Sequence, residues 1–203
     1  MHLFHYHLVT SKVREVEARY IGKLGFELNA RHGRIGEDLT SYESGMAWTE
    51  LDTLGFKLRL SELELGAVNV VVQPGQWAVP RIDHVGLALD DDEFEGAIAR
   101  AEDADLRVQE HGGRRTFVST NAGYRLELHP PRDWIDDLLE QGDRLRLSEL
   151  HLKADDPDAK AEALAHVLDC ERIGPEVEVG ETLVRFTPGG PQGRPELEAE
   201  MFT

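Results

Sequence analysis

The sequence predicts an α+β fold built from three βαβββ modules that follow one another along the chain. Segments of alternating polar and apolar residues begin at positions 3, 82 and 147, as half-buried strands do. Each is followed by apolar residues at three- and four-residue spacing, which is typical of a helix packed on a sheet. Further strand patterns follow each helix. An internal repeat of this kind indicates one supersecondary unit used three times.

Module one is expected over residues 1–78. Its opening strand, 3–9, places His5 and His7 on one face because side chains alternate along a strand. The stripe that buries the following helix consists of Val13, Val16, Tyr20 and Leu24. Residues 33–44 carry no clear period and are expected to form a long loop, a lid over a pocket or a disordered segment.

Module two is expected over residues 79–132. Its strand at 82–89 places His84 on one face, and the helix begins near Asp91 with an acidic first turn that suits the helix dipole. Two further strands are expected at 117–120 and 124–129.

A connector is expected at residues 133–144, and a third module at 145–203. Asp156 followed by Pro157 marks the start of its helix. Its strands are expected at 147–154, 176–186 and 196–202.

The apolar faces that must cover the helices align the three modules with one another. His84 in module two then corresponds to Glu149 in module three, and His5 takes the same place in module one. A shift of two residues in this alignment would place His7 instead of His5 at the position equivalent to His84, so both remain candidates.

Three motifs carry a resemblance to a known family: IDHVGL at 82–87, GYRLELHP at 123–130, and LGFEL at 24–28. On these motifs the chain resembles the vicinal oxygen chelate superfamily, which includes glyoxalase I, extradiol dioxygenases, methylmalonyl-CoA epimerase, and the fosfomycin and bleomycin resistance proteins. The resemblance is good over residues 1–130 and fainter over 145–203. It implies that modules one and two pair into a cupped mixed sheet around a metal site.

In that family the metal ligands come from the first and fourth strands of each module. The resemblance implies His5, His84 and Glu127 as ligands, with Val71 at the fourth place, where it cannot ligate. Two imidazoles and one carboxylate match the facial set of non-haem Fe(II) oxygenases. We therefore expect a divalent metal ion, with Fe(II) favoured and zinc, manganese or nickel as alternatives.

Three ligands favour extradiol-dioxygenase-like chemistry on a small molecule with adjacent oxygens. The isomerases of the family use carboxylates on both sides of the substrate, and one is absent here. The alternatives are a glyoxalase I-like lyase, an epimerase-like isomerase, and a non-catalytic antibiotic-binding protein. Phe117 stands where the extradiol signature has a tyrosine. His111, in a glycine-rich loop, is the candidate catalytic proton carrier.

The third module has no partner within the chain. We expect a homodimer in which a second copy covers its open sheet edge. Glu149, His151 and Glu198 are candidate ligands of a second metal site, and a degenerate structural repeat is the other interpretation.

The resemblance implies a small-molecule substrate as the partner, and the composition limits the other classes of partner. With 22 basic and 39 acidic residues the formal net charge is −17, which disfavours nucleic acid. No apolar run approaches the roughly 18 residues of a membrane span, and no signal peptide is evident, so a cytoplasmic protein is expected. Cys170, the single cysteine, is expected to be a buried apolar residue.

Overall fold

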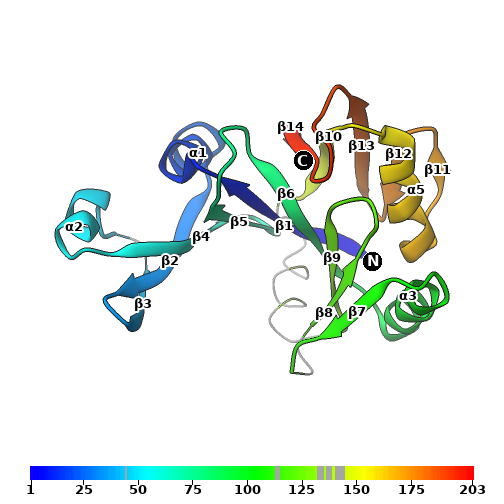
Figure 1. Ribbon diagram of the computed structural model, residues 1–203, viewed down its shortest axis with the longest axis horizontal. Helices are drawn as coiled ribbons and strands as arrows, with labels where there is room; N and C mark the ends of the chain where they lie inside the picture. The colour runs from blue at the N-terminus through cyan, green and yellow to red at the C-terminus, as the bar shows by residue number, and fades with distance from the viewer. Residues whose placement is uncertain (44, 113–114, 132–134, 136–138, 140–144) are drawn as a thin grey trace.

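The structure is a computed structural model of the 203-residue chain. It describes residues 1–43, 45–112, 115–131, 135, 139 and 145–203 (Figure 1). Most of the expected connector, 133–144, therefore lies outside the described residues. None of the described helices is both long enough and apolar enough to cross a bilayer.

Module one opens with strand β1 (His2–Thr10), helix α1 (Val13–Arg19) and the π-helical turn η1 (Tyr20–Leu24). Strands β2 (Glu27–Ile35), β3 (Asp38–Glu43), β4 (Lys57–Leu65) and β5 (Val68–Pro74) follow, with the short helix α2 (Trp48–Thr53) before β4. β1 pairs in parallel with β5, and the strand order is β1-β5-β4-β2-β3.

The expected loop or lid at 33–44 is wrong for its described part. Residues 33–35 end β2 and residues 38–43 form β3, and the two strands pair antiparallel around a turn at Gly36, whose φ is +60°. No residue of β3 is buried, so neither of its faces shows the apolar alternation by which a strand is recognised.

Module two consists of β6 (Arg81–Ala88), α3 (Asp91–Asp103), β7 (Arg107–Glu110), β8 (Thr116–Ser119) and β9 (Arg125–His129). The Asp90 side chain caps α3 by accepting a hydrogen bond from the backbone N–H of Glu93. β6 pairs in parallel with β9, and the order β6-β9-β8-β7 repeats the pattern of module one.

Module three consists of β10 (Leu147–Ala154), α5 (Pro157–Leu168), β11 (Arg172–Ile173), β12 (Glu176–Val179), β13 (Thr182–Pro188) and β14 (Glu196–Phe202). The single strand expected at 176–186 is wrong, because a turn at Gly180, with φ of +58°, splits it into β12 and β13. β13 is the strand parallel to β10, whereas β14 is an additional strand on the other edge of β10.

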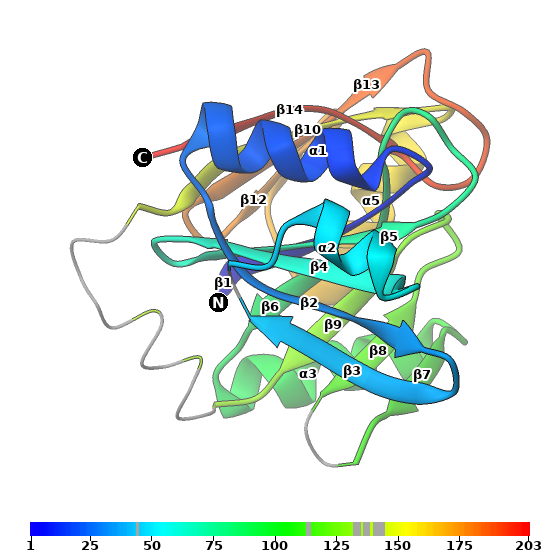
Figure 2. The same cartoon turned by 90° about the vertical axis from the view of Figure 1, so that its left-hand side faces the viewer.

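The modules join into one 14-stranded mixed sheet, which confirms the predicted α+β fold class. β1 pairs antiparallel with β6, and β14 contacts the start of β6 through Glu196 and Arg81. In Figure 2, α1 lies above the strands of module one, and α3 lies in the lower part of the view, beside the strands of module two. Alternation along β1 therefore sends Tyr6 and Leu8 into the core and places His5 on the opposite face.

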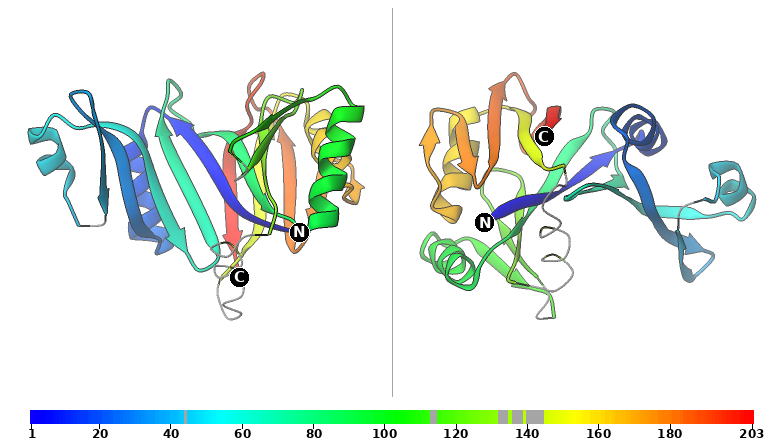
Figure 3. Two further views of the ribbon diagram at one scale, coloured as in Figure 1. Left: turned by 90° about the horizontal axis from the view of Figure 1, so that it is seen from below. Right: turned by 180° about the vertical axis from the view of Figure 1, so that it is seen from behind.

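Module three packs against module two along α3 and α5, which lie together at one end of the molecule (Figure 3). The Tyr124 hydroxyl donates a hydrogen bond to the Lys160 carbonyl oxygen at 2.8 Å, and the rings of Tyr124 and Phe186 lie 6.0 Å apart. The third module thus has neighbours within its own chain. The homodimer stays a prediction, to be checked by light scattering.

Candidate metal centre

The strand register places His5 and His84 at equivalent positions of the first strands of modules one and two. His5 pairs with Asn69 in β5, and His84 pairs with Arg125 in β9. Glu127 lies two residues beyond Arg125, at the place that Val71 holds in β5. Because β1 and β6 are neighbours in the sheet, the two histidines and Glu127 come together.

Three ligand atoms of these side chains converge. The Nε2 atoms of His5 and His84 lie 3.2 Å apart, and Glu127 Oε2 lies 2.8 Å from His84 Nε2 and 3.7 Å from His5 Nε2. Ligand atoms bound at about 2.1 Å and at right angles would lie about 3.0 Å from one another. The three buried side chains therefore have the spacing of three adjacent positions around one metal ion.

Hydrogen bonds on the far side of each imidazole define which ring nitrogen carries the proton. The His5 Nδ1–H donates to Asn69 Oδ1 at 2.6 Å, while Asn69 Nδ2 donates to Glu62 Oε1 at 3.0 Å. The His84 Nδ1–H donates to Asp83 Oδ2 at 2.8 Å. Both Nε2 atoms thus keep a lone pair directed at the centre, as histidine ligands with a second hydrogen-bond partner do.

An irregularity in β6 brings Asp83 beside the ring of the next residue. The β1–β6 register shifts between the pairs His7–His84 and Leu8–Ile82, which leaves Asp83 as an extra residue in β6. Neighbouring side chains of a regular strand point to opposite faces. The shift therefore allows one short stretch of β6 to supply both an imidazole and the carboxylate that orients it.

His7 stands directly beside this centre. One ring nitrogen from each of His5, His7 and His84 lies within 4.8 Å of the others, and the His7 and His84 rings are 4.6 Å apart. His7 Nε2 is hydrogen-bonded to Gln73 Oε1 at 3.0 Å. Burial, with the neighbouring imidazoles, lowers the pKa of His5 to about 4 and that of His7 to about 3. Both rings are then neutral near pH 7, which is the form that binds metal.

The Glu127 carboxylate is held through one of its oxygens. Arg115 donates to Oε1 at 2.7 Å, and His129 Nε2 lies 3.3 Å from the same oxygen, so Oε2 is left facing the two histidines. Although burial raises it, the pKa of Glu127 is held well below its usual range by the hydrogen bond from His129 and by the neighbouring imidazoles of His84 and His5. The centre therefore contains an ionised carboxylate.

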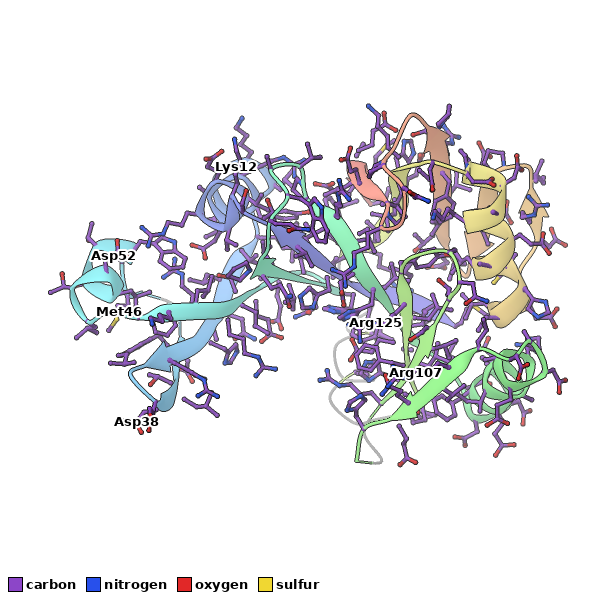
Figure 4. The ribbon with its side chains drawn as sticks, in the orientation of Figure 1. Lys12, Asp38, Met46, Asp52, Arg107 and Arg125 are labelled. Carbon is purple, nitrogen blue, oxygen red and sulfur yellow. The ribbon has the colours of Figure 1, made fainter. Side chains whose placement is uncertain are left out.

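A cavity of about 480 Å³ opens over these residues, within the range of about 300–1,000 Å³ usual for small-molecule sites. It lies between strands of modules one and two. In Figure 4, Arg125 lies near the middle of the molecule, between the β2–β4 strands and the helices α3 and α5. Besides the candidate ligands, the lining includes Phe4, His32, Arg59, Leu60, Val71, Gln73, Arg115, Phe117 and Arg125.

His111 lies outside this lining. Its side chain is exposed, and its ring packs edge-on against Phe117 with the centroids 5.4 Å apart. The Phe117 ring also contacts His84, at 5.1 Å. Phe117 therefore lies beside both His111 and the centre, and the role of His111 as a proton carrier stays a prediction.

The equivalent positions of module three do not form a second such group. By strand register Glu149 matches His5, but Arg185 takes the place of Glu127 and Ala199 that of His84. Glu149 Oε2 is 2.6 Å from His151 Nε2. Glu198 instead accepts a hydrogen bond from Thr187 and forms an ion pair with Lys153. Among the described residues, this favours the degenerate-repeat interpretation.

Comparison with known proteins rests on solved structures, since no family model and no curated protein match the sequence. The Mn(II)-bound glyoxalase from Novosphingobium aromaticivorans superposes with a TM-score of 0.58 at 15% identity, over 97% of this chain and 63% of the glyoxalase. A mutant of 4-hydroxymandelate synthase from Streptomyces coelicolor superposes with a TM-score of 0.62 at 16% identity. The superposition covers 99% of this chain and 70% of the synthase.

Homoprotocatechuate 2,3-dioxygenase from Arthrobacter globiformis gives a TM-score of 0.56 at 12% identity, over 96% of this chain and 61% of that enzyme. This chain thus spans somewhat less than two thirds of the glyoxalase and of this dioxygenase. This chain therefore shares the fold of these glyoxalase, synthase and dioxygenase structures, as the resemblance of its motifs led us to expect.

Proposed function

We propose that this protein is a metal-dependent enzyme that acts on a small molecule with adjacent oxygens. His5, His84 and Glu127 would hold the metal ion, and the cavity over them would hold the substrate. Extradiol-dioxygenase-like ring cleavage is the favoured reaction, and Fe(II) the favoured metal.

One observation carries the proposal. Both imidazoles use their Nδ1–H in hydrogen bonds to Asn69 and Asp83, so two Nε2 lone pairs and a carboxylate oxygen meet within 3.7 Å. Atoms of this kind repel one another in a buried site unless a cation or a proton lies among them. A divalent cation would satisfy all three at once, whereas a single proton would satisfy two.

The residues around the centre would bind and orient the substrate. When bound, Fe(II) would supply Lewis acidity and redox chemistry toward a substrate with adjacent oxygens. Phe117 and Val71 supply apolar wall, which limits water near the centre. Arg59 also lines the cavity; its side chain is exposed and forms no ion pair within the described part of the chain. It is therefore placed to bind an acidic group of the substrate.

Val71 is the reason for preferring ring cleavage. It holds the place opposite Glu127 where a fourth protein ligand would lie, and Gln73, next on that face, is engaged by His7. A glyoxalase-like lyase is the second candidate, because one similar structure is a glyoxalase. Further ligation by Gln73 would favour that alternative.

Metal analysis of protein purified without a histidine tag tests the proposal. The parent, loaded anaerobically with Fe(II), is expected to retain about one ion per chain, while His84→Ala and Glu127→Ala lose it. His151→Ala is a matched control, because this histidine also contacts a glutamate but lies in module three. Undiminished metal in both site variants would contradict the proposed ligands.

Activity measurements then separate the reactions. Oxygen uptake with catechols, including acid-bearing catechols, is expected for the Fe(II)-loaded protein. Turnover of methylglyoxal with glutathione, without oxygen uptake, would favour the lyase instead. A protein that binds metal but turns over neither class would contradict the proposed chemistry.

A further inference from the structure

Arg194 reaches from module three to the candidate metal centre of modules one and two. It lies in the segment between β13 and β14, and its NH2 group is 2.5 Å from Asp83 Oδ1. The other oxygen of Asp83 accepts the hydrogen bond from His84 Nδ1. Three side chains in contact, Arg194, Asp83 and His84, thus connect module three to a proposed ligand.

Backbone contacts fix the segment that carries Arg194. Lys160 Nζ donates to the Gly193 carbonyl oxygen at 2.9 Å, and the backbone N–H of Ile82 donates to the Pro195 carbonyl oxygen at 2.9 Å. Gly123 approaches so closely that a Cβ atom there would lie 2.5 Å from the Gly193 carbonyl group. Both residues next to Arg194 are therefore held in place, which limits where its side chain can lie.

The guanidinium group of Arg194 also contacts an aromatic ring. It lies over the Trp77 ring at 5.5 Å, and Arg81 contacts the same ring at 4.7 Å. The Arg194 side chain is 35% exposed. A ring contact and an ion pair together restrict the rotamers of a long side chain that otherwise has considerable freedom.

The two oxygens of Asp83 have different partners. Oδ2 receives hydrogen bonds from His84 and Arg125, whereas Arg194 is the ion-pair partner of Oδ1 among the described residues. The Asp83 side chain is 7% exposed, so water is a poor substitute for a lost partner. Removing Arg194 would therefore free one side of the carboxylate that orients His84.

We propose that Arg194 is a positioning residue of the metal centre, acting through Asp83 on the orientation and basicity of His84. This inference rests on the proposed function, because it needs His84 to be a ligand. It gives module three a role other than a second metal site. Partners of metal-bound histidines typically contribute about 10- to 100-fold to metal affinity.

The test measures metal affinity separately from folding. Apo protein is titrated with Co²⁺ or Zn²⁺ against a chelator, the visible spectrum of the Co²⁺ form is recorded, and thermal unfolding of the metal-free form is followed. Arg194→Ala is expected to raise Kd at least about 10-fold and to shift the Co²⁺ bands. Arg194→Lys, which restores the charge, is expected to recover part of the affinity.

Arg172→Ala is the matched control. Arg172 also lies in module three, is 30% exposed and pairs with Asp158 and Glu162, away from the centre. Its removal is expected to leave Kd and the Co²⁺ spectrum unchanged. If Arg194→Ala folds poorly, Arg194→Gln and Arg194→Lys replace it, and equal affinities of these two would overturn the charge-based role.

Two further outcomes separate this inference from the proposed function. Parental affinity in Arg194→Ala, with metal lost in His84→Ala, would overturn the role of Arg194 and leave the centre intact. Metal retained in His84→Ala would overturn the proposed function itself. In an Asp83→Ala background, Arg194→Ala is expected to cause no further loss, and a fully additive loss would contradict action through Asp83.

Discussion

Gly86 lies directly against His5 across the β1–β6 pair. A Cβ atom at position 86 would come 2.7 Å from the Cβ atom of His5 and 2.9 Å from its ring. Both distances are below ordinary contact, so either His5 or the local backbone would have to move. The missing side chain at position 86 thus lets His5 reach the position from which it approaches His84 and Glu127.

We therefore expect Gly86→Ala to weaken metal binding more than it weakens the fold. The added methyl group should displace the His5 ring, raise the metal Kd about 10-fold or more, and cost about 1–3 kcal/mol of unfolding free energy by overpacking. Chelator competition and urea unfolding check the two effects. Gly22→Ala is the control, since a Cβ atom there meets nothing within 4 Å. Parental Kd in Gly86→Ala would contradict the prediction.

A buried ion pair should stabilise module one. Glu17 Oε2 accepts from Arg31 Nε at 3.0 Å and from Ser61 at 2.8 Å, and Trp48 Nε1 donates to Oε1 at 2.9 Å. Glu17→Ala leaves the Arg31 charge buried, so a loss of about 3–5 kcal/mol is expected in urea unfolding. Lys12→Ala breaks only an exposed pair and should cost less than about 1 kcal/mol. Similar losses in both variants would be inconsistent with this difference.

Metal stoichiometry should be one ion per chain. Arg185 and Ala199 hold the places in module three that Glu127 and His84 hold in module two, and neither binds a cation. Glu149→Ala is therefore expected to bind as much metal as the parent, as measured by elemental analysis after exhaustive loading. Two ions in the parent and one in Glu149→Ala would instead indicate a second site.

The thiol of Cys170 should react slowly in the native protein. Its side chain is half-buried against the core, and burial raises its pKa to about 11. At pH 8 this leaves about 100-fold less thiolate than an ordinary cysteine would have. Alkylation by iodoacetamide, followed by mass spectrometry, is expected to be slow in buffer and fast in urea. Equal rates in the two conditions would contradict the raised pKa.

Much of module two could be predicted from local patterns. The alternation around His84, the acidic start of α3 and the strand that carries Glu127 are each encoded within a few neighbouring residues, and the structure has these elements near the expected positions. The β2–β3 hairpin differs from the expected loop because no residue of β3 is buried, so no apolar period marks the strand.

The split of 176–186 into β12 and β13 was missed for a related reason. Apolar residues alternate up to Val179 and resume at Leu183, so the turn is marked only by Gly180, with its positive φ, and the polar residues that follow it. The strand that is parallel to β10 is therefore β13, whereas Glu198 lies in β14, on the other edge of β10.

The sequence by itself determined the repeat and the α+β class, and it limited the counterpart of His84 in module one to His5 or His7, because strand and helix periods are local properties of the chain. The tertiary structure decided which polar groups meet. The approach of His5 to Glu127, the displacement of Asp83 and the reach of Arg194 all join residues far apart in sequence. Such contacts depend on the register between neighbouring strands and on where a glycine permits close approach. The polar and apolar periodicity within one segment determines neither of these.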